Sequence, residues 1–197
     1  LLDFLADVEA NQKLELILRG GASPNPTEPV SVAQNEGRVA IDTGVLRLSL
    51  SPSGKGLFGQ LRALERETGQ WREMLSGCTA RVRTRVGTFR AGGRRRSLEV
   101  EREGPVRATV VVRGEHLNPD GERCFSFVVR LHAFAGSSIL KLEYMILNDN
   151  AEGVFTHLRE AAVDFQLPNT VDGVEFGGFA TEGAGSKLRL FQDYDDH

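Results

Sequence analysis

A long alternating run between Glu103 and Asn150 constrains the fold of this chain more than any other feature. Apolar and polar side chains alternate along it and β-branched residues are frequent, which is typical of β-strands because alternate side chains point to opposite faces. Gly104-Pro105 marks the start, since proline cannot donate to a strand ladder. The turn sequences Asn118-Pro-Asp-Gly121 and Ala135-Gly-Ser-Ser138 divide the rest. The run therefore predicts an antiparallel meander of three strands.

Shorter alternating segments on both sides of the meander predict further strands. In the segment Val45–Ser51, which follows a Thr43-Gly44 turn, the three leucines 46, 48 and 50 share one face. The predicted strands outside the meander cover residues 13–19, 38–42, 45–51, 57–66, 79–86, 97–103, 156–167, 173–180 and 187–191. Roughly a dozen short strands without sustained βαβ alternation predict an all-β fold, a large antiparallel β-sandwich or a barrel.

The length of the chain is sufficient for one core, because a domain of this size buries about 70% of the surface of its unfolded form. We expect residues 1–29 to be a lead-in. It comprises a short helix or a frayed terminus over Leu1–Ala10, a first strand over Lys13–Arg19, and a loop rich in proline and glycine. Residues 30–197 are expected to form a single β-domain. Because the chain starts at Leu1 and ends soon after a predicted strand, we expect this domain to be excised from a longer multidomain protein.

Charge is distributed unevenly, although the net charge is only −3. Residues 81–107 hold 9 basic and 3 acidic residues, a balance of +6, between flanking blocks of −2 and −7. No stretch reaches the ~18 apolar residues of a membrane span, and Leu1–Glu9 lacks the basic region of a signal peptide. The composition therefore predicts no membrane partner and leaves the compartment open.

Three arginines with a period of two are the best-defined candidate site. Arg81, Arg83 and Arg85 would line one face of a strand at intervals of about 6.6 Å. Such a row could bind carboxylates bidentately, as an acidic polysaccharide would require. The alternative, which we favour, is a solvated face paired with the acids of the following strand, Glu99, Glu101 and Glu103.

Aromatic residues near the arginines are few, which argues against nucleic acid. Phe89 is the only aromatic residue between Trp71 and Phe125, whereas binding of single strands needs several stacking surfaces. Trp71 itself could stack on a sugar ring, although a single tryptophan is more often part of a core. We therefore name Trp71 and the three arginines as candidate binding residues and predict no nucleic-acid partner.

Residues for acid–base, metal or redox chemistry show no recognisable spacing. The internal histidines, His116, His132 and His157, lie on separate predicted strands and match no zinc motif. A pair of carboxylates among Asp149, Glu152 and Glu160 could face a glycosidic bond, but acids on a β-surface are commonly solvated. The two cysteines, Cys78 and Cys124, are either bridged or free and buried. We predict no metal and no cofactor, and assign no catalytic residue.

Four segments in order carry a resemblance to a known family. They are Ile41-Asp-Thr-Gly-Val-Leu46, then Glu103-Gly-Pro-Val-Arg-Ala-Thr-Val110, then Phe134-Ala-Gly-Ser-Ser138 leading to Leu142-Glu-Tyr144, and finally Leu190-Phe-Gln-Asp193. In this order and spacing they resemble the N-terminal RIFT-barrel domain of YetA-like and exo-rhamnogalacturonan lyase-like proteins. The resemblance spans about residues 30 to 193 and implies a RIFT-type barrel as one form of the all-β fold.

The resemblance implies a β-domain that precedes an α-helical toroid in a larger enzyme acting on pectic rhamnogalacturonan. Most of the catalytic machinery of such a lyase would lie on that downstream helical domain, so this chain alone is expected to be non-catalytic. An acidic polysaccharide and the helical domain are then the expected partners, and a secreted or periplasmic location is favoured. The alternatives are an autonomous carbohydrate-binding module and a structural or assembly domain.

Overall fold

The structure is a computed structural model, and it describes residues 3–6, 8–15, 17, 26–52, 56–92, 97–150, 156–168, 173–176 and 179–182. Within these residues every regular element is a β-strand and every strand pair is antiparallel. The strands are β1 (Ser31–Asn35), β2 (Arg38–Asp42), β3 (Leu46–Leu50), β4 (Leu61–Leu64), β5 (Trp71–Leu75), β6 (Gly77–Arg83), β7 (Thr88–Ala91), β8 (Ser97–Glu103), β9 (Arg107–Leu117), β10 (Arg123–Phe134), β11 (Leu140–Leu147), β12 (Glu160–Gln166), β13 (Gly173–Phe176) and β14 (Phe179–Glu182). The all-β prediction is confirmed.

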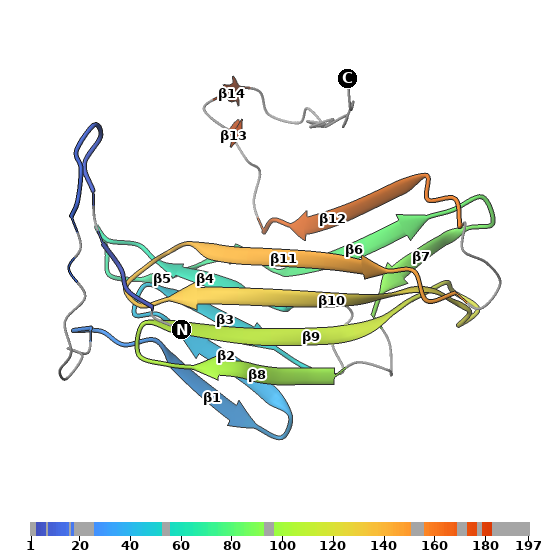
Figure 1. Cartoon of the computed structure of the whole chain (residues 1–197), viewed down its shortest axis with the longest axis horizontal. Helices are drawn as coiled ribbons and strands as arrows, with labels where there is room; N and C mark the ends of the chain where they lie inside the picture. Colours follow the sequence, from blue (N-terminus) through green and yellow to red (C-terminus); the bar gives the residue numbers. More distant parts are fainter. Residues whose placement is uncertain are drawn as a thin grey trace.

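Two sheets form a sandwich (Figure 1). The smaller sheet has the order β1-β2-β3-β4-β5, and the larger has the order β11-β10-β9-β7-β6-β12, with β8 paired to β9. The larger sheet curls, and its β6 and β12 are drawn higher in Figure 1 than β9 and β10. The hairpin β13-β14 forms a third, separate sheet. The fold is thus a sandwich with one half-curled layer.

The predicted meander is confirmed as β9, β10 and β11. Its turns fall at the two predicted positions, with Gly121 at φ +83° and Gly136 at φ +65°. Both angles belong to the left-handed region that glycine enters without strain. The β2–β3 turn at Thr43-Gly44 is also confirmed, and there the Gly136 amide donates to the Thr43 carbonyl at 2.7 Å. This contact ties the two sheets together at one end.

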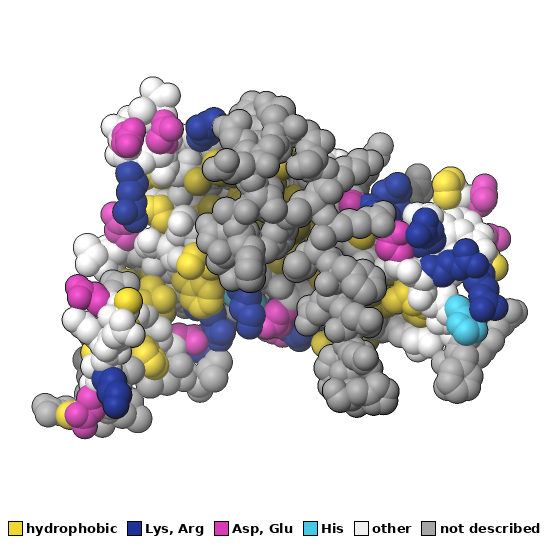
Figure 2. Space-filling model, turned by 90° about the horizontal axis from the view of Figure 1, so that it is seen from above, with side chains coloured by type: hydrophobic (Ala, Val, Ile, Leu, Met, Phe, Trp, Pro, Cys, Tyr) yellow, Lys and Arg dark blue, Asp and Glu magenta, His cyan; other side chains and the backbone are white. Residues whose placement is uncertain are grey.

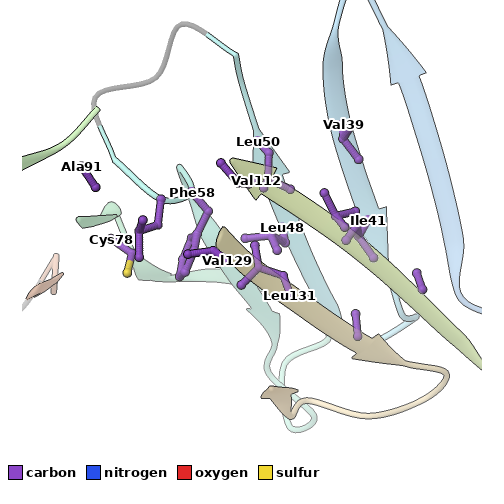
Figure 3. Close-up of a cluster of buried hydrophobic side chains, with 14 of the residues drawn as sticks. Val39, Ile41, Leu48, Leu50, Phe58, Cys78, Ala91, Val112, Val129 and Leu131 are labelled. Atoms are coloured by element: carbon purple, nitrogen blue, oxygen red, sulfur yellow. The ribbon is translucent and has the colours of Figure 1, made fainter. Parts of the chain in front are cut away.

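The core lies between the two sheets (Figure 3). Ile41, Leu48 and Leu50 of the smaller sheet point toward Val129 and Leu131 of β10, and each is at most 2% exposed. This arrangement follows from strand alternation, because the leucines of β3 share one face while Arg47 and Ser49 share the other. Cys78 and Cys124 are both free and buried, in two different apolar clusters.

Of the two alternatives for Leu1–Ala10, a short helix or a frayed terminus, the described residues do not form the helix. Residues 3–6 and 8–10 adopt no helix, and Lys13–Glu15, the described start of the predicted first strand, lies in no strand. Asp3 is ion-paired with Arg102 at 3.0 Å and Arg107 at 3.2 Å, which holds this segment against β8 and β9. Phe4 and Val8 are more than half exposed, so a helix here would bury no apolar face to support it.

The predicted strand over residues 187–191 and most of the proline-rich loop lie outside the described residues. Among those that are described, we find no helix with the length and apolar character needed to cross a membrane.

Candidate functional site

The predicted arginine row is only two residues long. Arg81 and Arg83 lie on the outer face of β6, opposite the buried Cys78, Ala80 and Val82. Arg85 lies beyond the end of the strand, in the bend before Gly87. Although the alternation of the sequence continues, the strand ends at Arg83, because the chain turns there: the Thr84 hydroxyl accepts a hydrogen bond from the Val86 amide at 3.2 Å. The row of three is therefore wrong, and Arg85 takes no part in it.

The acidic partners of Arg81 and Arg83 come from β12. Glu160 accepts from Arg81 at 2.8 Å and from Arg83 at 2.9 Å, and Asp164 also pairs with Arg81. The hydrogen bonds that Arg81 donates to Asp164 and, to a lesser extent, to Glu160 raise the pKa of its guanidinium. Basic and acidic side chains adjoin at this end of the molecule, where β6 ends and β12 begins (right in Figures 1 and 2). These two arginines are thus neutralised within the domain.

The predicted pairing with Glu99, Glu101 and Glu103 is wrong for a topological reason. Strand β8 hydrogen-bonds to β9, whereas β6 lies between β7 and β12. Glu99 accepts from Arg113 of β9 at 2.8 Å, and Glu101 from Arg130 of β10 at 3.0 Å, which lowers the pKa of Glu101. Sequence neighbours therefore do not become sheet neighbours here, although the interpretation of a paired, solvated face holds for Arg81 and Arg83.

Replacing Arg81 by methionine should lower the free energy of unfolding by about 1 kcal/mol, because the ion pairs are partly exposed and water screens them. The loss should shrink in 1 M salt. Chemical denaturation of the variant and of Arg66→Met, which removes an exposed arginine, gives the comparison. An equal effect of the two substitutions would contradict the assignment.

Trp71 lies at the start of β5, on the outer face of the smaller sheet. The Arg47 guanidinium sits 3.8 Å from the centre of its ring, a cation–π contact. Trp71 pairs with Leu64 across β4 and β5, whereas Arg81 and Arg83 belong to the other sheet. The structure therefore does not bring the candidate tryptophan and the candidate arginines together.

The carboxylates considered for glycoside chemistry are held by other side chains. Asp149 accepts from the Ser126 hydroxyl at 2.6 Å and from the Ser126 amide at 3.0 Å, and pairs with Arg123. Burial raises the pKa of Asp149, but the hydrogen bonds from Ser126 and Arg123 outweigh it and leave the pKa lowered. Glu160 is bound to β6, and Glu152 lies outside the described residues.

The internal histidines do not converge. His132 is buried, not solvated as an outward-facing position would suggest, and its Nδ1 lies 3.0 Å from the Thr109 hydroxyl. His157 is exposed. Within the part of the chain that the structure describes, no three histidine, cysteine or acidic side chains are grouped as metal ligands.

His116 forms a buried polar pair that the sequence analysis missed. Its Nδ1 lies 3.1 Å from the Phe125 carbonyl, and its Nε2 bonds the Tyr144 hydroxyl. A ring whose Nδ1–H donates to a carbonyl leaves Nε2 as an acceptor, so the hydroxyl donates and the imidazole is neutral. Burial lowers the pKa of His116 and raises that of Tyr144. His116 lies on β9 and Tyr144 on β11, so only the order of these strands on either side of β10 could have suggested this pair.

A trough runs along the outer face and one end of the smaller sheet. One part has a volume of about 610 Å³ and reaches Cys78 and Gln166, and a second part has about 400 Å³. Ala33, Ala40 and Ser49 line both parts, so the two are continuous. We call this surface the polar trough. Its charged lining residues are Arg38, Asp42, Arg47 and Arg62.

Glycine is required where the trough meets β6. A Cβ atom on Gly56 would lie 2.2 Å from the Cys78 carbonyl oxygen, and the neighbouring Leu57 amide donates to that oxygen at 2.6 Å. The backbone therefore approaches β6 too closely for any side chain. Burial raises the pKa of the Cys78 thiol to about 12, so this cysteine is a protonated part of the trough wall.

The comparison with known families matches residues 30–168 to the model described as the PcRGLX-like protein central beta sandwich domain. The chain belongs to this family. The match covers both sheets of the sandwich and ends just after β12. The resemblance found in the sequence is thereby confirmed at the level of the family, and the family description places the matched domain as the central sandwich.

A curated relative is similar to this member of the PcRGLX-like family. The uncharacterized protein YetA of Bacillus subtilis (strain 168) is 26% identical over 149 residues, which cover 73% of this chain. The chain spans 17% of the length of that relative.

Proposed function

We propose that this PcRGLX-like domain is a non-catalytic β-domain of a polysaccharide lyase-like protein that acts on acidic pectic glycan of the rhamnogalacturonan type. The family and its resemblance to exo-rhamnogalacturonan lyase-like proteins support the substrate class. The relative YetA is much longer than this chain, which is consistent with further domains beside this one.

The non-catalytic role is supported by one observation: the candidate acid–base groups are ion-paired or buried. Elimination next to a uronate needs a general base in contact with substrate and a group that neutralises the carboxylate. Among the described residues, the candidates for the base do not meet the first need: Asp149 and Glu160 are ion-paired, and His116 is completely buried. We infer that the base lies on another domain, such as a downstream helical one.

An elimination assay tests this proposal. The formation of unsaturated product from rhamnogalacturonan should be absent with this chain alone and present with a longer protein that includes the downstream sequence. Full activity of this chain alone would contradict the non-catalytic role. An inactive longer protein would contradict the lyase-like assignment.

An autonomous carbohydrate-binding module is the second candidate function. The polar trough favours it, because a concave surface with polar side chains in its lining suits a sugar chain. A purely structural or assembly domain would instead leave the trough without affinity for any glycan.

A further inference from the structure

The polar trough combines an extended hollow with hydrogen-bonding side chains. Alternation places Ala33, Ala40 and Ser49 in one register row across β1, β2 and β3, where their small side chains leave the hollow open. Further polar side chains stand along the hollow. They are Asn35 and Gln60 beside the smaller sheet, and Ser76, Thr79 and Gln166 at the β6 end. Such a lining offers both donors and acceptors, as sugar hydroxyls require.

The charge of the lining is positive. Its charged residues are three arginines and one aspartate, which gives +3 − 1 = +2. Asp42 is already bound by the Arg47 Nε at 2.7 Å and the Gly44 amide at 2.8 Å. The acid opposite Arg62 in the next strand, Glu73, is hydrogen-bonded to Gln60. Asp42 is therefore ion-paired with Arg47, and the Glu73 carboxylate is held by the neutral Gln60 amide rather than by Arg62.

Of the three arginines that line the trough, Arg38 and Arg62 are the two that remain available to a ligand. Both are exposed, and neither forms an ion pair with any residue that the structure describes. They stand on β2 and β4, on the same outer face, so they lie on two sides of the Ala40–Ser49 pair. Arg81 and Arg83 differ in this respect, since Glu160 and Asp164 hold them. A guanidinium without an acidic partner is the group that binds an incoming carboxylate bidentately.

We propose that the polar trough is a binding site for a carboxylate-bearing oligosaccharide, with Arg38 and Arg62 as its carboxylate ligands. The choice of a glycan as the ligand rests on the proposed function. The two arginines, the hollow and its polar side chains are observed in this domain and do not depend on the proposed function. The site lies on the smaller sheet, away from the arginines that the sequence analysis selected.

Trp71 supplies a direct readout. It is the single tryptophan of the chain, and its ring is in cation–π contact with the guanidinium of Arg47, a residue that lines the trough. Titration of this chain with an oligogalacturonide should change the Trp71 fluorescence and saturate. Calorimetry on the same samples gives the dissociation constant. Binding should weaken as salt is raised, because part of the affinity is electrostatic. The methyl-esterified oligogalacturonide, which lacks the carboxylates, should bind at least about tenfold more weakly.

The double variant Arg38→Ala/Arg62→Ala should weaken oligogalacturonide binding by about tenfold or more. The matched control is Arg85→Ala/Arg90→Ala, which removes two exposed arginines from the β6–β7 bend and β7, and the same amount of charge. The control should keep nearly the wild-type affinity. Circular dichroism and thermal unfolding verify that both variants are folded.

Equal weakening by the two double variants would overturn the site, since it would indicate binding to net charge alone. No saturable binding of the oligogalacturonide by the wild-type chain would also overturn it, and would favour coverage of the trough by another domain. Neither result affects the elimination assay, so failure of this site and failure of the proposed function are distinguishable.

Discussion

Replacing Phe127 by alanine should lower the free energy of unfolding by about 3–5 kcal/mol, the usual loss for a large aromatic side chain in a core. Phe127 lies on β10, the central strand of the meander, and is 1% exposed. Its ring centre lies 5.1 Å from that of His116 and 6.3 Å from that of Tyr144. The truncation therefore opens a cavity beside a buried polar pair, and the rigid sheet around it cannot collapse to fill the space.

Urea denaturation followed by circular dichroism measures this loss. Met145→Ala on the adjacent strand β11 is the matched control, because Met145 is 52% exposed on the outer face. The control should cost less than about 1 kcal/mol, since little apolar surface leaves water at that position. A loss of the same size from both substitutions would show that Phe127 is not part of a tightly packed core.

Acidification from about pH 6.5 to 5 should destabilise the protein through His116, by up to about 1.4 kcal/mol per pH unit. Burial lowers the pKa of His116 in the fold. The unfolded chain therefore binds a proton in this range that the folded chain does not, and the free energy of unfolding falls as the pH falls. Above the unfolded pKa of histidine the contribution is constant.

The carboxylates are not expected to obscure this effect. The pKa values of Glu101, Glu143 and Asp149 are lowered in the fold, so their stabilising contribution is lost only at more acidic pH. Unfolding curves of His116→Gln at several pH values should show a flatter dependence between pH 6.5 and 5. His157→Gln, at an exposed position, should leave the slope of the wild-type protein unchanged. A slope that persists in His116→Gln would assign the titration to another group.

The strand predictions succeeded where alternation and turn chemistry agreed. The meander, the Thr43-Gly44 turn and strand β8 all combine a period of two with a residue suited to a tight turn or a break. The helix alternative for Leu1–Ala10 is wrong over the described residues, because a helical spacing of apolar residues does not stabilise a helix unless a partner surface buries them. The predicted strand over residues 79–86 was too long, since Thr84 and the following bend end it at Arg83.

The candidate site was harder to predict than the fold. Arg81 and Arg83 were selected because their spacing is visible in one segment. Arg38 and Arg62 were not, since they are 24 positions apart and have no common local pattern. Only the register of β2, β3 and β4 brings them to one face. The pairing of His116 with Tyr144 likewise depends on two strands that flank β10.

The sequence by itself determined the fold class, the meander and the family, because these depend on local alternation, on turn residues and on the order of short segments. The tertiary structure decided which charges are neutralised and which remain available to a ligand. The reason is that ion pairs form between strands that are neighbours in a sheet, and β12 reaches β6 from 79 positions away along the chain. Whether an arginine is free to bind a ligand therefore depends on the order of the strands in the sheet. That order cannot be read from any single segment of the sequence.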